Sequence, residues 1–240
     1  MKTHNTQKKY HFFMNNLTLL TYTHSKCTDL HPAYFGRIEK YFPSLKNKYV
    51  TCNEFVPYGE CVVYDNSDTH SNQMVDVLSK IPTDYVIYSQ EDYVLFDYVK
   101  EDTIKEYIDL MDTDKSIGFI RLIQSGVNGM NVEYNKDLLY VDSNSEYFFS
   151  TQATIWRREV LLEMFKNSKV DSIFYEPYNS NFLKELGIVG LYTKSRGDAV
   201  GGHYNSVVYP YIATAKVKGY WNILEYPKEV HELIQEYNLR

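Results

Sequence analysis

The sequence predicts an α/β protein with a doubly wound, mostly parallel central sheet flanked by helices. Three observations lead to this fold class. Short apolar runs, too short for most helices, recur along the first half of the chain. Stretches of about ten residues with apolar side chains at helical spacing separate these runs. Prolines close two of those stretches. Strands that alternate with helices in this way are typical of a parallel sheet covered on both faces.

The first half supplies most of the predicted sheet. We expect strands at residues 17–22, 49–52, 61–64, 84–88 and 117–123. Between them, helices are indicated by the apolar sets Leu30, Tyr34, Ile38, Tyr41 and Phe42, then Met74, Val75, Leu78 and Ile81, then Ile104, Tyr107, Ile108 and Met111. The first two helices should end before Pro43 and Pro82, because proline disfavours helical geometry in the preceding residue.

The second half is less regular. We expect a strand at 138–141, an extended stretch at 147–155, a β-rich stretch at 207–217, and helices at 157–165, about 178–186 and about 228–237. No internal repeat, low-complexity tract or linker interrupts the chain. The sequence therefore predicts one domain over residues 1–240.

The composition limits the classes of protein to which the chain can belong. Of the 240 residues, 44% are apolar and 23% are charged, as in ordinary folded proteins. The net charge of −6 gives no basic face for nucleic acid, so no nucleic-acid partner is expected. The odd cysteine count, Cys27, Cys52 and Cys61, argues against a disulfide framework and suits a reducing compartment. No apolar run of about 20 residues could span a bilayer. These features predict a cytoplasmic protein without a transmembrane segment.

An acidic pair is the central chemical feature. Glu91 and Asp92 directly follow the strand predicted at 84–88. Doubly wound sheets bind ligands beyond the carboxyl ends of their strands. Carboxylates there can hold Mg²⁺ or Mn²⁺ and leave positions open for phosphate oxygens, so that the ion neutralises charge on a departing diphosphate. We therefore expect Glu91 and Asp92 to bind the metal, with Asp92 part of the catalytic machinery. The alternative is a solvated acidic turn or a helix cap.

Several segments together resemble the nucleotide-sugar glycosyltransferases of the GT-A fold, in particular small viral and bacterial members with an acidic DxD-like motif. VIYSQEDYVLF resembles their metal-binding strand and motif, although Gln90-Glu91-Asp92 stands where Asp-x-Asp is usual. VVYDNSDT resembles the segment that contacts the nucleoside, with Tyr64 in place of its first aspartate. LLTYTH resembles the first strand and loop. The resemblance implies that the nucleoside is bound by Thr21, Tyr22, Asp65 and Ser67.

The second half resembles the acceptor side of these enzymes. YFFSTQATIWRREVLL resembles their acceptor region, which implies that Gln152 and Trp156 contact the acceptor. The large ring of Trp156 could stack on a sugar, or it could belong to the core. Glu176 resembles the general base of inverting members; Asp171 is the nearest competitor, and a helix-start cap is the alternative role of Glu176.

Two further residues come from the same resemblance. His203, beside Gly201-Gly202, resembles a histidine that completes the metal site, and its alternative is a solvated loop histidine. Lys218 resembles a basic C-terminal residue that contacts the diphosphate, and its alternative is an ordinary surface lysine.

The resemblance implies an enzyme of the hexosyltransferase type. It would move a sugar from a nucleoside diphosphate sugar, with UDP favoured, to a hydroxyl of a glycan or glycoconjugate, assisted by Mn²⁺ or Mg²⁺. Residues 17–115 would form the nucleotide-binding half and residues 116–240 the acceptor-binding half. Two alternatives stay open. A nucleotidyltransferase would usually carry a glycine-rich basic loop after the first strand, where THSKCTDL holds only Lys26. A non-catalytic carbohydrate- or nucleotide-binding module would keep the fold without the reaction.

Overall fold

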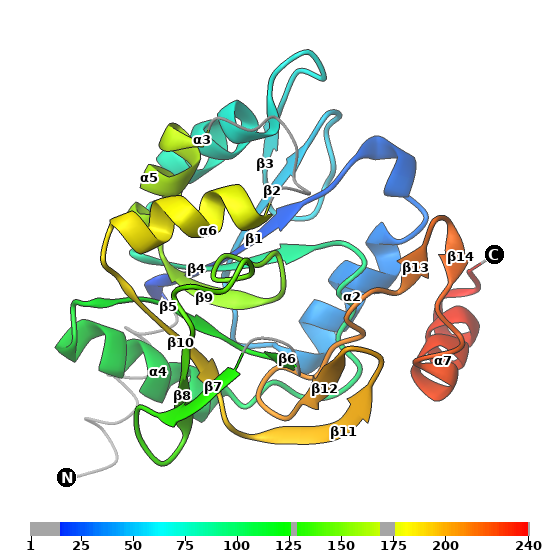
Figure 1. The fold of residues 1–240 in the computed structure, drawn as a ribbon. Coiled ribbons are helices and arrows are strands. Elements are labelled where there is room, and N and C mark those ends of the chain that lie inside the picture. The colour runs from blue at the N-terminus through cyan, green and yellow to red at the C-terminus, as the bar shows by residue number, and fades with distance from the viewer. Residues whose placement is uncertain (1–14, 126–128, 169–175, 240) are drawn as a thin grey trace, which may run out of the picture.

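A computed structural model describes residues 15–125, 129–168 and 176–239 of the chain. The described residues form a nine-stranded sheet with the order β3-β2-β1-β4-β9-β5-β10-β8-β7 (Figure 1). Strands β3, β2, β1 and β4 pair in parallel, and so do β5 and β10. Strand β9 lies antiparallel between β4 and β5, and β8 is antiparallel to both of its neighbours. The predicted α/β fold with a mostly parallel sheet is confirmed.

The strands of this sheet are β1 (Leu17–Tyr22), β2 (Asn47–Cys52), β3 (Glu60–Val63), β4 (Tyr85–Gln90), β5 (Ile117–Arg121), β7 (Gly129–Glu133), β8 (Leu138–Val141), β9 (Thr154–Arg157) and β10 (Val189–Thr193). Two smaller sheets lie beside it, one formed by β6 (Gln124–Ser125), β11 (Arg196–Val200) and β12 (His203–Ser206), the other by β13 (Lys216–Val217) and β14 (Tyr220–Trp221).

Helices cover both faces of the large sheet. One face is covered by α2 (His31–Tyr41) and α4 (Glu101–Thr113), and α7 (Pro227–Tyr237) packs on α2. The other face is covered by α3 (His70–Lys80), α5 (Arg158–Asn167) and α6 (Glu176–Glu185). Figure 1 shows the second group of helices lying together. Strand β1 is buried on both faces: Leu19 packs into one core and Leu20 into the other. A strand buried on both faces has no polar side to alternate with.

The predicted helices of the first half are confirmed. Thr69 caps α3 by accepting a hydrogen bond of 3.2 Å from the Asn72 amide, which satisfies one free N–H of the first turn. The helix ends two residues before Pro82. Its buried face differs slightly from the prediction, because Val77 is fully buried whereas Val75 is only partly buried.

The second half departs further from the sequence prediction. The extended stretch expected at 147–155 is a strand only from Thr154 onward. Phe148 and Phe149 are consecutive and both pack into the same core, which a strand cannot achieve because its neighbours point to opposite faces. The β-rich stretch expected at 207–217 is mostly irregular, with β13 and a single bridge from Tyr211 to Leu95. Among the described helices, none combines the length and apolarity needed to cross a bilayer.

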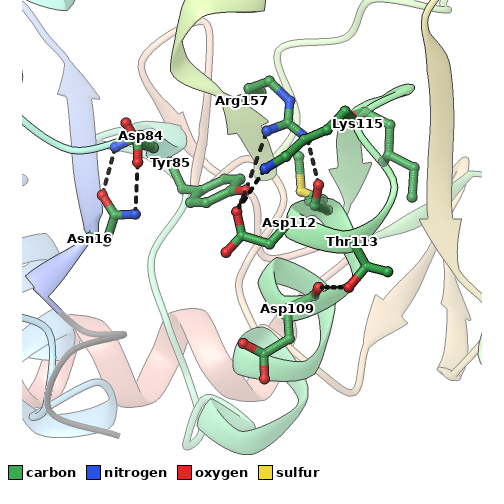
Figure 2. Close-up of polar contacts among 10 residues, drawn as sticks. Asn16, Asp84, Tyr85, Asp109, Asp112, Thr113, Lys115 and Arg157 are labelled. Carbon is green, nitrogen blue, oxygen red and sulfur yellow. Dashed lines mark hydrogen bonds and ion pairs between the residues drawn. The ribbon is translucent and has the colours of Figure 1, made fainter. Parts of the chain in front are cut away.

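A buried arginine cluster holds the amino end of β4. Figure 2 shows Arg157 between Tyr85 and the end of α4. Its Nη1 donates to the Tyr85 hydroxyl (3.3 Å) and its Nη2 to the Met111 carbonyl (2.6 Å). The Tyr85 hydroxyl in turn donates to Asp112 (2.7 Å), which also binds Lys115 (3.1 Å). These hydrogen bonds tie β9 to β4 and α4.

This cluster predicts a large stability loss for Arg157→Met. The substitution leaves buried carbonyl and hydroxyl groups without a donor, so we expect the free energy of unfolding in urea to fall by about 3 kcal/mol. Lys115→Met is the matched control, because its ion pair with Asp112 is 67% exposed on the lysine side and should contribute less than about 1 kcal/mol. Equal losses in the two variants would contradict a structural role for Arg157.

Candidate active site

The acidic pair forms the turn that ends β4. The Tyr93 amide donates to the Gln90 carbonyl (3.1 Å) and closes this turn. The chain beyond it pairs with a segment distant in sequence: the Ala215 amide donates to the Asp92 carbonyl and the Ile212 amide to the Val94 carbonyl, both at 2.9 Å. The position of the acidic pair is therefore set by the end of β4 on one side and by residues 212–215 on the other.

A cavity of about 490 Å³ opens at the carboxyl ends of β1 and β4. Both halves of the chain contribute to its wall, which consists of Tyr22, Thr23 and His24 after β1, Gln90, Glu91, Asp92 and Tyr93 at the end of β4, Thr151 and Gln152 before β9, Glu176 at the start of α6, and Thr214. This is the edge of a doubly wound sheet where ligands bind.

In the described part of the chain, the carboxylates of the cavity wall have no lysine or arginine opposite them. Glu91, Asp92 and Glu176 line the cavity, whereas no lysine or arginine of the described residues does. The Oδ1 atom of Asp92 is shielded from solvent and has no hydrogen-bond partner among the described residues. Burial, followed by the neighbouring Glu91 carboxylate, raises the pKa of Asp92 from an ordinary 3.8 to about 7. An unpaired carboxylate in such a place needs a cation or a proton.

Glu91 differs from Asp92 in its surroundings. Burial raises its pKa, while interactions with the Cys27 thiol and the Thr23 hydroxyl act in the opposite direction. Glu91 thus already has polar partners, and Asp92 is the more available metal ligand. The described residues contain no group of three histidine, cysteine, aspartate or glutamate side chains that could hold a metal alone. Oxygens of a ligand or of water would have to complete the shell of Mn²⁺ or Mg²⁺, which both ions accept.

Glu176 reaches the cavity from the first residue of α6. Its Oε1 accepts hydrogen bonds from the Thr151 amide (2.7 Å) and the Thr151 hydroxyl (3.2 Å). One turn further along, the Ser180 hydroxyl accepts from the Phe149 amide (2.9 Å) and donates to the Glu146 carbonyl (2.8 Å). These bonds fix the loop before β9 against α6. The competitor Asp171 lies outside the described residues.

Tyr22 is held rigidly at the other side of the cavity. Its ring stacks parallel to that of Tyr64 with centroids 5.6 Å apart, and it meets His70 edge-on at 4.7 Å. Its hydroxyl donates to Gln73 Oε1 (2.9 Å), and the Gln73 amide donates to the carbonyls of Asp65 (3.3 Å) and Asp68 (3.0 Å). Tyr22 thereby connects the cavity to the loop after β3.

The other residues predicted to bind the nucleoside lie outside the cavity wall. Thr21 is buried beneath it, where its hydroxyl bonds to that of Tyr34 (3.0 Å). Asp65 is exposed, and its Oδ1 accepts from the amide and hydroxyl of Ser67, both at 2.8 Å. These bonds lower the pKa of Asp65, the amide bond contributing most.

Three further predicted site residues do not line the cavity. Trp156 is fully buried and packs on Phe119 with ring centroids 4.6 Å apart, so the acceptor-stacking role is wrong: β9 lies in the middle of the sheet, and its side chains on this face belong to the core. His203 lies on β12, where burial lowers its pKa, and does not line the cavity with the acidic pair. Lys218 is exposed in the β13–β14 turn with φ of 52°.

Six cavity residues were not among the predicted site residues: Thr23, His24, Gln90, Tyr93, Thr151 and Thr214. Thr23, Gln90, Tyr93 and Thr151 stand directly beside residues that were predicted, and His24 follows Thr23. Thr214 lies in an irregular segment, and no sequence pattern marks it.

The chain was compared with known proteins. No family model and no curated protein matches it. Among solved structures, residues 1–349 of S. aureus TarS match with a TM-score of 0.52 and 13% identity, over 92% of this chain and 64% of that one. A CMP:2-keto-3-deoxy-manno-octonic acid synthetase complexed with CTP matches with a TM-score of 0.49 and 13% identity, over 77% of this chain and 93% of that one. Mannosyltransferase PcManGT from Pyrobaculum calidifontis, in complex with GDP-Man and Mn²⁺, matches with a TM-score of 0.46 and 8% identity, over 73% of this chain and 53% of that one. At 13% identity the likeness to TarS shows the fold alone.

The raised pKa of Asp92 predicts how the metal-free protein responds to pH. Between about pH 4 and pH 7 the native state holds a proton on Asp92 that the unfolded chain releases, so this group lowers stability as pH rises through that window. We expect Asp92→Asn to be stabilising in EDTA, by about 2 kcal/mol more at pH 8 than at pH 4.5. Urea unfolding of the wild type and the variant at pH 8 and at pH 4.5 measures this difference in stability.

Asp76→Asn is the control for this experiment. Asp76 lies exposed on α3 in an ion pair with Lys80, so its removal changes the net charge equally without touching the cavity. An Asp92 variant that gains no more than the Asp76 variant at pH 8 would mean that the Asp92 carboxylate is not destabilised by burial.

Proposed function

We propose that this protein is a metal-dependent glycosyltransferase that moves a sugar from a nucleoside diphosphate sugar to a hydroxyl of a carbohydrate acceptor. One observation carries the proposal. Glu91, Asp92 and Glu176 share a cavity at the carboxyl ends of parallel strands, and the shielded Oδ1 atom of the half-buried Asp92 has no hydrogen-bond partner among the described residues. Such a cavity suits a polyphosphate only together with a divalent cation. Glu176 is then a further carboxylate that can accept a proton.

The donor side follows from charge. A diphosphate beside Glu91 and Asp92 would be repelled, because no lysine or arginine in the described wall offsets the carboxylates. Mn²⁺ or Mg²⁺ binds carboxylate and phosphate oxygens together, so we assign the ion to Asp92 with support from Glu91. When bound, the ion would stabilise the charge that develops on the departing diphosphate. His203 and Lys218 are not needed for this arrangement.

The nucleoside would extend from the cavity over Tyr22. The Gln73 side chain joins Tyr22 to the loop that carries Asp65 and Ser67, and this loop follows β3 at the same edge of the sheet. The Asp65 and Ser67 side chains are exposed and can reach a ribose or base that continues beyond the cavity. Thr21 would act only indirectly, through the packing beneath Tyr22.

The acceptor side centres on Glu176. Two hydrogen bonds from Thr151 hold its Oε1, so Oε2 remains to accept the proton of a sugar hydroxyl. In a single displacement the hydroxyl oxygen forms a bond to the anomeric carbon of the donor, its proton passes to Glu176, and the bond from that carbon to the diphosphate oxygen breaks. Gln152 lies beside Glu176 in the wall and would bind the acceptor.

Nucleotidyl transfer is the less favoured reaction. Its nucleoside triphosphate carries more negative charge than a diphosphate sugar, and the site would need basic side chains in addition to metal. After β1 the cavity wall offers Thr23 and His24, and Lys26 is not part of it. Lys216, close by, already pairs with Asp29.

Metal-dependent donor binding tests the proposal. We expect UDP-type nucleotide sugars to raise the melting temperature of the protein with Mn²⁺ and not with EDTA, since a ligand that binds the native state stabilises it by about 2.7 kcal/mol at 100 times its Kd. Asp92→Asn should abolish this shift, while Asp76→Asn should keep it. A full shift in EDTA, or in the Asp92 variant, would contradict metal-mediated binding.

Glu176→Gln separates an enzyme from a binding module. The glutamine oxygen can still accept from Thr151 but cannot take up a proton, so nucleotide-sugar binding should persist while sugar transfer falls by about 10²- to 10⁴-fold. Release of nucleoside diphosphate, followed with and without added glycosides, measures it. Unchanged turnover would remove Glu176 from the reaction, and the absence of turnover in the wild type would favour a non-catalytic module.

A further inference from the structure

A buried tyrosine lies directly behind Gln152. Tyr211 is fully buried, and its hydroxyl lies between two groups of the loop before β9. The hydroxyl accepts a hydrogen bond from the Ala153 amide (3.3 Å) and lies 2.7 Å from the side-chain oxygen of Gln152. These contacts settle which end of the Gln152 amide points at the tyrosine.

The orientation follows from proton counting. A backbone amide can only donate, so the bond from Ala153 uses the acceptor capacity of the Tyr211 hydroxyl. The single phenolic proton then needs an acceptor, and Gln152 Oε1 is the one at bonding distance. With the amide reversed, the phenolic proton would be buried without a partner, which is unfavourable. Gln152 therefore keeps its oxygen toward the core.

The nitrogen of Gln152 consequently faces the cavity. It makes one long contact of 3.5 Å with the Tyr93 hydroxyl, which also lines the cavity. A primary amide has two N–H groups, so at least one remains for a ligand. Nearby, the Oε2 atom of Glu176 remains as an acceptor, since Thr151 occupies Oε1. The acceptor half of the cavity thus presents one donor beside one carboxylate.

We propose that Tyr211 is a positioning residue that fixes Gln152 as a hydrogen-bond donor, and that the cavity thereby selects an uncharged sugar as acceptor. The inference rests on the proposed function and adds the class of acceptor. The reacting hydroxyl donates to Glu176, and a neighbouring oxygen of the same sugar accepts from Gln152. A carboxylate or phosphate on that sugar would meet Glu91, Asp92 and Glu176 without a basic residue of the described wall to balance it.

Tyr211→Phe tests the positioning role, with Tyr209→Phe as its matched control. Tyr209 is equally buried and packs 5.7 Å from the Tyr211 ring, but its hydroxyl has no hydrogen-bond partner among the described residues. Both variants lose one buried hydroxyl, and only the first frees the Gln152 amide. We expect Tyr211→Phe to weaken acceptor binding about tenfold and to leave Mn²⁺-dependent nucleotide stabilisation unchanged, as one lost hydrogen bond implies.

The direct readout is the side-chain amide signal of Gln152 in ¹⁵N-labelled protein, assigned by its loss in Gln152→Ala. Methyl hexosides and the corresponding methyl hexuronides are titrated in without nucleotide, and again with Mg²⁺ and UDP. The hexosides should shift this signal in the wild type and in Tyr209→Phe. In Tyr211→Phe the same shift should need about tenfold more hexoside, because binding is weaker. The hexuronides should not shift the signal in any of these proteins. In the Gln152→Ala background, Tyr211→Phe should have no further effect on acceptor binding.

Three results would overturn the inference: hexuronides that bind as well as hexosides, identical behaviour of the two tyrosine variants, or no hexoside that shifts the signal under either condition. The titration without nucleotide does not depend on donor chemistry. Hexoside binding at Gln152 in a protein that never binds a nucleotide sugar would therefore contradict the proposed function and leave the acceptor selection standing.

Discussion

An unpaired carboxylate oxygen governs this cavity. Asp92 lies half-buried at the end of β4 beside Glu91, its Oδ1 atom is shielded from solvent, and the described wall supplies no lysine or arginine to neutralise either carboxylate. Burial keeps the pKa of Asp92 high, so in the absence of a cation the carboxylate favours a proton. Under the proposed function, a divalent cation shared with the diphosphate would relieve the repulsion between the carboxylates and the donor. Metal binding and donor binding would then both depend on this unpaired carboxylate oxygen.

The fold maintains this arrangement through two contacts from one segment. Ala215 donates to the Asp92 carbonyl and holds the metal turn, while Tyr211 orients Gln152 on the acceptor side. The segment carries little regular structure, yet Tyr211 and its neighbours are buried against the sheet. At the other end of β4, the Arg157 cluster fixes where the strand begins. Residues from both halves of the chain therefore line the one cavity, and the division near residue 115 stays a prediction.

The sequence predicts the half of the site that follows regular strands. Glu91 and Asp92 were predicted because parallel strands place their following residues at one edge, and apolar runs of four to six residues locate those strands. Tyr22, Glu176 and Gln152 were predicted through the resemblance, and all three line the cavity. Trp156 was misassigned because an apolar ring in a short strand looks the same whether it faces a core or a sugar. Thr151, Thr214 and Tyr211 were beyond prediction, since they lie in segments with little regular structure and no periodic pattern marks which of their side chains face the cavity.

The central claim is that Asp92 and a nucleoside diphosphate share one divalent ion. Crystals grown with Mn²⁺ and UDP, measured at the manganese absorption edge, test it directly. An anomalous peak in direct contact with an Asp92 carboxylate oxygen and with diphosphate oxygens is the predicted result. Diphosphate bound in the cavity with no manganese at Asp92, or manganese bound elsewhere in the protein, would contradict the account.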